Sequence, residues 1–167
     1  MSGFASLTRE QEQSTEATVK EVIRRLRSYQ TVDGSFSYWP GGTAPNAWGT
    51  VYAIHFLLEA EKKGYLVPEG MKRNALNDLS RIARNWKPEA SYSAESEEMT
   101  QAYRLFVLAL GQVAEVGAMN RLKESKTLMS MSRYLLAAGY ALVGRPDVSK
   151  ELVVKTTALT TACSGYD

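Results

Sequence analysis

The stretch that decides the fold is QTVDGSFSYWPGGTAP at residues 30–45, followed by NAWGTVYAIHFLLEAEKK at residues 46–63. Glycine and proline punctuate the first part, where Asp33-Gly34 and Pro40-Gly41-Gly42 are turn signals. The second part is apolar on nearly every helical face through its first three turns. We therefore expect an ordered loop with buried aromatic side chains, leading into a helix that belongs inside the molecule.

Individual residues of the loop have expected structural roles. Gly34 permits a tight turn, and the Asp33 carboxylate can accept hydrogen bonds from nearby backbone N–H groups. Phe36 and Trp39 are suited to fill the space between neighbouring helical hairpins. Asn46 is expected to cap the helix that follows.

Helical periodicity predicts further helices on either side of this stretch. Amphipathic helices are expected at residues 8–30 and 68–88, and a second largely apolar helix at 99–116, capped by Ser96. Pro68 suits a first helical position. The remaining predicted elements are a short one at 118–124, helices at 126–143 and 146–154, and an irregular end at 155–167.

Outer, one-faced helices thus alternate with inner helices that are apolar on most faces. Such alternation requires inner helices to be covered on both sides, as in helical hairpins stacked in two layers. The sequence therefore predicts a single all-α domain over residues 1–167, and solenoids and α/α toroids both satisfy the pattern.

Composition excludes several classes of protein. The 167 residues are 44% hydrophobic and 23% charged, which is typical of a globular domain, with a formal net charge of +2. Acids are interleaved with the bases, so no stripe suits a nucleic acid backbone. No apolar run approaches the roughly 18 residues of a membrane span. Cys163 is the single cysteine, which excludes an internal disulfide and a cysteine-based metal site.

Two residues are candidates for catalytic groups. His55 could be a general base, but the sequence offers no partner nucleophile for it, so packing or hydrogen bonding within an inner helix is expected. Asp33 could be the acid of a terpene cyclase or part of a metal site. Such sites need several converging carboxylates, which the sequence does not supply.

Two clusters have competing interpretations. Glu95, Glu97 and Glu98 could bind a cation, but a charged helix start near the positive end of the helix dipole is favoured. The aromatic residues could line a ligand pocket, but core packing is favoured; this set is Phe36, Tyr38, Trp39, Trp48 and Tyr52. We therefore predict no catalytic, cofactor-binding or metal-binding residue.

One family resemblance rests on the loop and on the helix after it. The residues that carry it are Gln30, Asp33, Gly34, Phe36, Trp39, Pro40, Gly41, Gly42 and Trp48. This pattern resembles the bacterial alpha-2-macroglobulin-like proteins, in the part of their thioester domain just after the thioester segment. The resemblance continues in family order over roughly residues 20–153, through KGYLVP at 63–68, QAYRL at 101–105, AMNRLKE at 118–124 and LAAGYALVG at 136–144.

The resemblance implies a partial α/α toroid of stacked helical hairpins with alternating outer and inner helices. It also implies a part in protease inhibition or trapping, and a periplasmic or cell-envelope location. The implied partners are the other domains of a larger macroglobulin-like protein and its target proteases. About half of a closed toroid would be present, so we expect either self-association or an exposed apolar groove.

The chain departs from the family at its reactive centre. Many members carry an internal thioester built from a Cys-x-Glu-Gln segment, and these 167 residues contain none. Complement-type members place a histidine at the start of a later inner helix, where this chain has Glu98 to Gln101 and no histidine. The expected role is therefore without intrinsic turnover.

Two other functions remain open from the sequence. The first is a helical scaffold that binds proteins through exposed apolar surface, with no link to proteases. The second is a terpene cyclase or prenyltransferase-like enzyme, because squalene-type cyclases share both the toroid and a Gln-x-x-Asp-Gly-x-aromatic motif. Kinship of fold does not carry chemistry with it.

Overall fold

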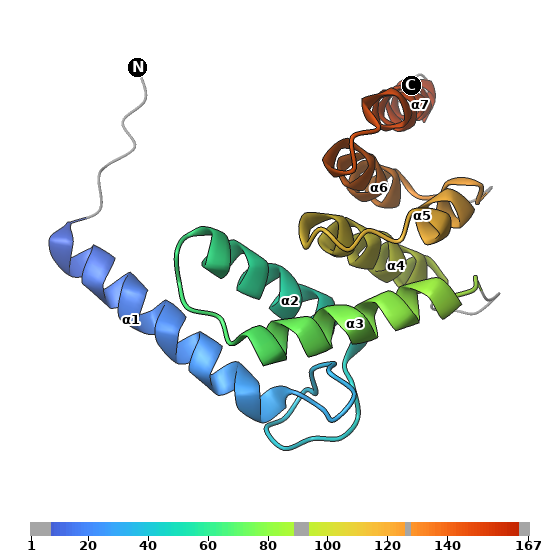
Figure 1. Cartoon of the computed structure of the whole chain (residues 1–167). Helices are drawn as coiled ribbons and strands as arrows, with labels where there is room; N and C mark the ends of the chain where they lie inside the picture. The colour runs from blue at the N-terminus through green and yellow to red at the C-terminus, as the bar shows by residue number, and fades with distance from the viewer. Residues whose placement is uncertain (1–7, 89–93, 126–127, 164–167) are drawn as a thin grey trace.

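The computed structural model describes residues 8–88, 94–125 and 128–163, and over these residues the chain is all-α, as predicted (Figure 1). The described part contains no strand, only isolated bridges between Gln30 and Phe36 and between Ser37 and Pro45. The helices are α1 (Arg9–Leu26), the short 3-10 helix η1 (Arg27–Tyr29), α2 (Ala47–Lys62), α3 (Glu69–Asn85), α4 (Ala94–Leu110), α5 (Val116–Lys123), α6 (Ser130–Leu142) and α7 (Pro146–Cys163).

Helices α2, α4 and α6 form the inner layer of the molecule. They follow one another across Figure 1, with α3 and α5 along their outer side and with α1 and α7 at the two ends. The largest fully buried side chains lie mostly on these three helices, among them Ile54, Leu57, Leu105, Leu108 and Leu136. The expected alternation of outer and inner helices is confirmed.

The first two inner helices run in the same direction. Trp48 of α2 packs on Tyr103 of α4, with ring centroids 5.2 Å apart. Seven residues further along α2, His55 packs edge-on against Phe106, at 5.6 Å. Because the contact residues rise in number together, α2 and α4 are parallel, as hairpins stacked side by side require.

Helices α4 and α6 are also parallel. Glu98 of α4 contacts Met129, the residue that precedes α6. Further along, Gly139 of α6 approaches the backbone of Phe106, where a methyl group would lie 3.6 Å from its Cα atom. Glycine thus allows close packing of the two helices, and all three inner helices are parallel.

The outer helix α3 is amphipathic because only one of its faces is covered by the inner layer. Helix α3 turns one apolar stripe inward, which includes Met71, Ala75 and Leu79, and carries its charged residues elsewhere.

Helix α1 begins with a capping box, in which the Thr8 hydroxyl accepts from the Gln11 backbone while the Gln11 side chain accepts from the Thr8 backbone.

Several predicted boundaries are wrong. Ser96 does not cap α4, which begins two residues earlier at Ala94. That helix ends at Leu110 instead of residue 116, because Gln112 adopts a left-handed backbone with a φ of 61°. Pro68 lies just before α3 instead of in its first turn. Helix α6 starts at Ser130, four residues later than expected.

The C-terminal end also differs from the prediction. An irregular segment was expected from residue 155, but α7 continues to Cys163. Its first half packs on α6 through the buried side chains of Val148 and Leu152. The threonine-rich sequence after Lys155 has low helix propensity, and the helix continues there despite it. None of the described helices has the length and apolarity needed to cross a membrane.

Candidate interaction surface

The loop at residues 30–45 is fixed to the outer helix α3. Gly34 has a φ of +108°, and a Cβ atom built on it would lie 2.4 Å from the backbone oxygen of Asn74. Only glycine fits this position. The amide of Gln30 donates to the Gly34 oxygen at 3.1 Å and to the Met71 oxygen at 2.9 Å. The glycine and the glutamine of the motif therefore hold the loop against α3.

The loop is also fixed to the inner helix α2. Phe36 is 2% exposed, so its predicted burial is confirmed. The backbone N–H of Phe36 donates to the Thr50 hydroxyl at 2.9 Å, and the backbone N–H of Asn46 donates to the Phe36 oxygen at 2.8 Å. Asn46 in turn accepts from the Gly49 N–H at 2.6 Å, which confirms the predicted cap of α2.

Two aromatic residues of the loop are not buried. Tyr38 is 66% and Trp39 70% exposed, so the prediction that Trp39 fills an internal space is wrong. The two rings pack edge-on against each other instead, with centroids 4.7 Å apart. Asp33 is also exposed, and its turn is closed by the Gly34 N–H, which donates to the Thr31 oxygen.

The turn at the end of the loop uses the remaining motif residues. Pro40 is exposed. Gly41 has a φ of +73°, and its N–H donates to the Ser28 oxygen at 2.6 Å. A Cβ atom at Gly42 would lie 2.9 Å from the Cβ atom of Ser37. These residues shape the turn and do not converge on a ligand-binding site.

A buried polar network lies between the loop, α3 and α4. The Ser35 hydroxyl donates to the buried Asp78 carboxylate at 2.5 Å, and Arg81 pairs with the other carboxylate oxygen. On α4, Arg104 donates to the Gln101 side-chain oxygen. Burial lowers the pKa of the Arg104 guanidinium to about 10, so it is still a cation at neutral pH. Its Nε atom is buried without a hydrogen-bond partner.

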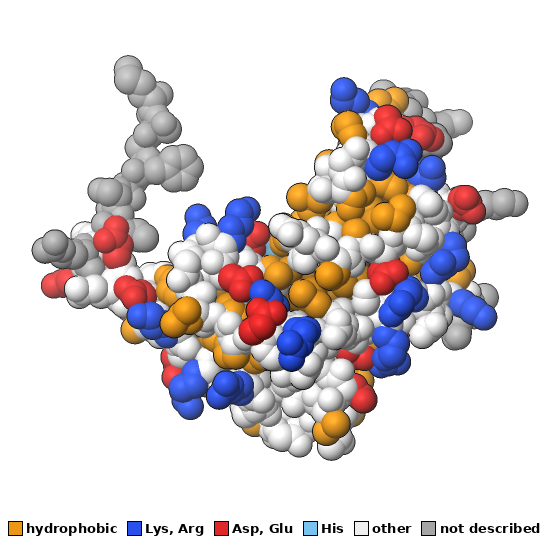
Figure 2. Space-filling model, viewed as in Figure 1, with side chains coloured by type: hydrophobic (Ala, Val, Ile, Leu, Met, Phe, Trp, Pro, Cys, Tyr) orange, Lys and Arg blue, Asp and Glu red, His pale blue; other side chains and the backbone are white. Residues whose placement is uncertain are grey.

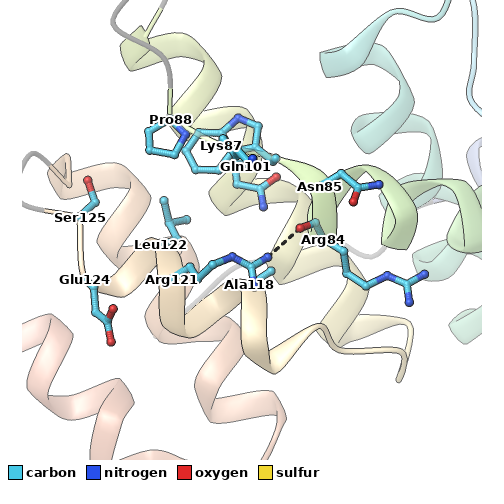
Figure 3. A pocket seen from close by; sticks show the side chains of 11 residues that line it. Arg84, Asn85, Lys87, Pro88, Gln101, Ala118, Arg121, Leu122, Glu124 and Ser125 are labelled. Carbon is cyan, nitrogen blue, oxygen red and sulfur yellow. Dashed lines mark hydrogen bonds between the residues drawn. The ribbon is translucent and has the colours of Figure 1, made fainter.

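Side chains from two other helices donate hydrogen bonds to the C-terminal end of α3. The Gln101 amide of α4 donates to the Ala83 oxygen at 3.0 Å, and Arg121 of α5 donates to the Arg84 oxygen at 2.8 Å. These oxygens have no partner within their own helix. Figure 3 shows the Arg121 side chain directed toward the Arg84 backbone. Both residues line a hollow of about 680 Å³, together with Lys87, Pro88, Ala118, Leu122 and Glu124.

The acidic residues at the start of α4 have separate roles. Glu95 and Glu97 lie in the first turn of the helix, as the charged-start interpretation predicts. Glu98 is buried, and its carboxylate accepts from the Met129 N–H at 2.9 Å. The described residues contain no cluster of three or more potential metal ligands.

His55 lies at the junction of α2 and α4. Its Nδ1 atom is 2.8 Å from the Tyr103 hydroxyl, and its ring packs edge-on against Tyr103 and Phe106. The predicted packing and hydrogen bonding within an inner helix are confirmed. The contacts of the His55 ring are with Tyr103 and Phe106, and no nucleophilic side chain is among them.

The remaining apolar residues of α2 are not buried. Tyr52 is 65% exposed and Trp48 about half exposed, so the expectation that α2 lies inside on every face is wrong. The helix has two apolar stripes. Val51, Ile54 and Leu57 face the core, and the other stripe faces solvent. Tyr38, Trp39, Trp48 and Tyr52 are thus neither core residues nor the lining of one shared pocket.

Helices α4 and α6 continue the solvent-facing stripe. On α6, Met131, Tyr134 and Leu142 are each about half exposed, whereas Leu136 and Tyr140 on the other side of the helix are buried. We call the combined surface the inner face. It consists of Trp48, Tyr52, His55 and Phe56 of α2; Met99, Tyr103, Phe106 and Leu110 of α4; and Met131, Tyr134, Leu135, Ala138 and Leu142 of α6.

Figure 2 shows hydrophobic side chains gathered over α4 and α6, in the hollow between α2 and α7. The inner face contains no Asp, Glu, Lys or Arg side chain. A hollow of about 490 Å³ meets its edge at Leu110. A smaller one on the face itself has about 210 Å³ and is lined by Tyr52, His55, Phe56 and Glu59. That volume is below the roughly 300 Å³ at which small-molecule sites begin. The inner face is suited to contact with another apolar protein surface.

The sequence contained a signal for this surface. The apolar residues of α6 at 131, 134, 138 and 142 recur at helical spacing, and so do those at 136, 137 and 140. Two apolar stripes on one helix predict two covered faces. The sequence alone does not say that one of them is open to solvent.

No family model matches the chain. An alpha-2-macroglobulin of Escherichia coli K12 is 29% identical over 138 residues, and one of Xylella fastidiosa Temecula1 is 31% identical over 129 residues. These alignments include 80% and 74% of the chain, which spans 8% of the length of each relative. A crystal structure of trypsin-activated alpha-2-macroglobulin from Escherichia coli superposes with a TM-score of 0.75 at 24% identity, over 88% of this chain and 10% of that one.

Proposed function

Because the chain belongs to the bacterial alpha-2-macroglobulin family, we propose that it serves protease inhibition as a non-catalytic module that assembles with other protein through its inner face. The observation that carries this proposal is the uncharged stripe that crosses three parallel helices. Such a surface costs free energy in water and is stabilised when a second apolar surface covers it.

The residues also favour non-covalent action. Covalent capture of a protease in this family uses a thioester, and the 167 residues contain no Cys-x-Glu-Gln segment. Cys163 is followed by Ser164, Gly165 and Tyr166, so it cannot supply one. The proposed contribution is therefore a binding surface, with no bond made or broken.

A protease-protection assay tests the proposal. Trypsin is the appropriate probe, since it activates the related alpha-2-macroglobulin of Escherichia coli. With the chain in excess, we expect slower digestion of a large substrate such as casein and unchanged cleavage of a small chromogenic peptide. This split separates steric inhibition from blocking of the protease active site.

Variants connect any protection with the inner face. Tyr52→Lys combined with Tyr134→Lys places two charges on it and should abolish the protection. Tyr38→Lys changes an equally exposed tyrosine on the loop and should leave the protection intact. Casein digestion that is the same with and without the wild-type chain would refute the proposal, and so would full protection by the double variant.

A further inference from the structure

We propose that a groove at the junction of α3, α4 and α5 binds an extended segment of another protein, which carries an acidic and a basic side chain with an apolar one between them. Two adjoining hollows, of about 680 Å³ and 270 Å³, form the groove and share Trp86, Pro88 and Ser125. We call their combined surface the Trp86 groove. It shares no residue with the inner face, so this inference is independent of the proposed function.

The middle of the Trp86 groove is apolar. Ala118 and Leu122 of α5 line it and are buried, and Trp86 lies just after α3, partly buried against the core. Figure 3 shows Leu122 opposite Pro88 across the larger hollow. An apolar side chain that enters here leaves water for an indole ring and a leucine. The middle of the groove therefore suits a side chain of the size of leucine.

The larger hollow carries positive charge. Arg121 uses one N–H group on the Arg84 oxygen, which leaves the others of its guanidinium as donors. Among the described residues, neither Arg121 nor Lys87 forms an ion pair. Glu124 also lines this hollow, but Figure 3 shows its carboxylate directed away from Leu122. A carboxylate that enters the larger hollow is therefore met by two cations that lack an acidic partner.

The smaller hollow carries negative charge. Glu95 lines it from the first turn of α4, is exposed, and has no ion-pair partner in the part of the chain that the structure describes. Glu97 lines the same hollow. Glu98 does so too, but its carboxylate is already bound to the Met129 N–H. A basic side chain of the partner would therefore pair with Glu95.

The length of the groove favours a peptide over a small ligand. Gln101 lines the larger hollow and Glu95 the smaller one, and their positions on α4 are about 9 Å apart at the usual rise of about 1.5 Å per residue. An extended chain covers that distance in about three residues. A ligand with charge of one sign would be repelled at one of the two ends. The partner segment therefore has its acidic and basic residues about three positions apart.

NMR titration of the 167-residue chain tests the inference. The probes are acetyl-Asp-Leu-Leu-Lys-amide and, for the opposite chain direction, acetyl-Lys-Leu-Leu-Asp-amide. One of them should shift the Trp86 indole N–H resonance with a dissociation constant of about 1 mM or below, and Trp86→Phe identifies that resonance. The uncharged acetyl-Asn-Leu-Leu-Gln-amide should bind about fivefold more weakly, because it lacks both ion pairs.

Charge reversals test whether the groove recognises the charges of the peptide. Lys87→Glu should weaken binding of the preferred peptide by about fivefold or more, whereas Lys150→Glu, an exposed site on α7, should leave it unchanged. Glu95→Lys should exchange the preference, so that acetyl-Asp-Leu-Leu-Asp-amide becomes the tighter ligand. A purely structural role of Glu95 would not produce this exchange. Circular dichroism verifies that the variants are folded.

Three results would overturn the inference. The first is no shift of the Trp86 resonance by either charged peptide at 10 mM. The second is an unchanged peptide preference in Glu95→Lys. The third is binding of isovalerate, a small branched carboxylate, as tightly as the peptide, because the groove would then be a small-molecule site.

Discussion

The Glu98 carboxylate accepts a hydrogen bond from the backbone N–H of Met129 at 2.9 Å, so a buried side chain of α4 binds the N-terminal end of α6. A negative charge is stabilised at a helix N-terminus by the helix dipole. Across a sequence separation of 31 residues, this contact fixes how one hairpin sits on the next.

Replacing Glu98 by Ala should lower the free energy of unfolding by about 1.5 to 3 kcal/mol, the range for hydrogen bonds to charged groups. Glu98→Gln keeps an acceptor and should cost less. Urea denaturation measures both, with Glu95→Ala as the control, since Glu95 is exposed about one turn earlier on α4. Equal losses in Glu95→Ala and Glu98→Ala would contradict the capping role.

Gly34 and Gly41 form a matched pair for a second prediction. Both have positive φ. A Cβ atom at Gly34 would lie 2.4 Å from the Asn74 backbone, whereas a Cβ atom at Gly41 would have no neighbouring atom within 4 Å. Gly41→Ala should cost about 1 kcal/mol from backbone strain alone. Gly34→Ala should cost at least twice as much, because the loop must also move away from α3. Thermal unfolding that ranks the two variants equally would disprove the steric argument.

Arg104 offers a test of a buried charge. Its guanidinium is desolvated, has an unpaired Nε, and donates to the neutral Gln101 side chain. Asp78 keeps Ser35 and Arg81 as partners without it. Arg104→Met should therefore leave the free energy of unfolding within about 1 kcal/mol of wild type, or raise it.

Arg104→Ala is the contrasting variant, because it leaves a cavity and should cost about 2 to 3 kcal/mol. The pH dependence has a definite sign. The folded-state pKa of about 10 lies below the ordinary 12.5, so the cost of the buried cation is fully present below pH 10. It declines as pH rises between these two values, and wild type should gain stability relative to Arg104→Met there.

Arg121 provides a fourth prediction. It donates to the Arg84 oxygen at the end of α3, a bond between two outer helices. Arg121→Ala should destabilise the chain by about 1 kcal/mol. Lys123→Ala, in the same last turn of α5, should destabilise it by less than half of that. Hydrogen exchange at the last turn of α3 should increase in the first variant only. Unchanged exchange there would show that the hydrogen bond contributes little.

Sequence periodicity predicted the helices well, because apolar stripes on α3 and α6 are local patterns. The turn residues Gly34 and Asn46 were also predictable, since each acts through its own backbone neighbourhood. Two features of the structure could not be predicted from the sequence. The exposure of Trp39 and Tyr52 depends on which side of the chain a neighbour covers. The side-chain caps from Glu98, Gln101 and Arg121 bind helix ends far away in sequence.

Those same three side chains have a consequence for how the chain unfolds. Repeated hairpins that contact only their neighbours can melt one at a time from an end. Here α4 binds the C-terminal end of α3 with Gln101 and the N-terminal end of α6 with Glu98. Unfolding of α4 would leave polar backbone groups of both α3 and α6 without partners. The helices from α3 to α6 should therefore unfold in a single transition.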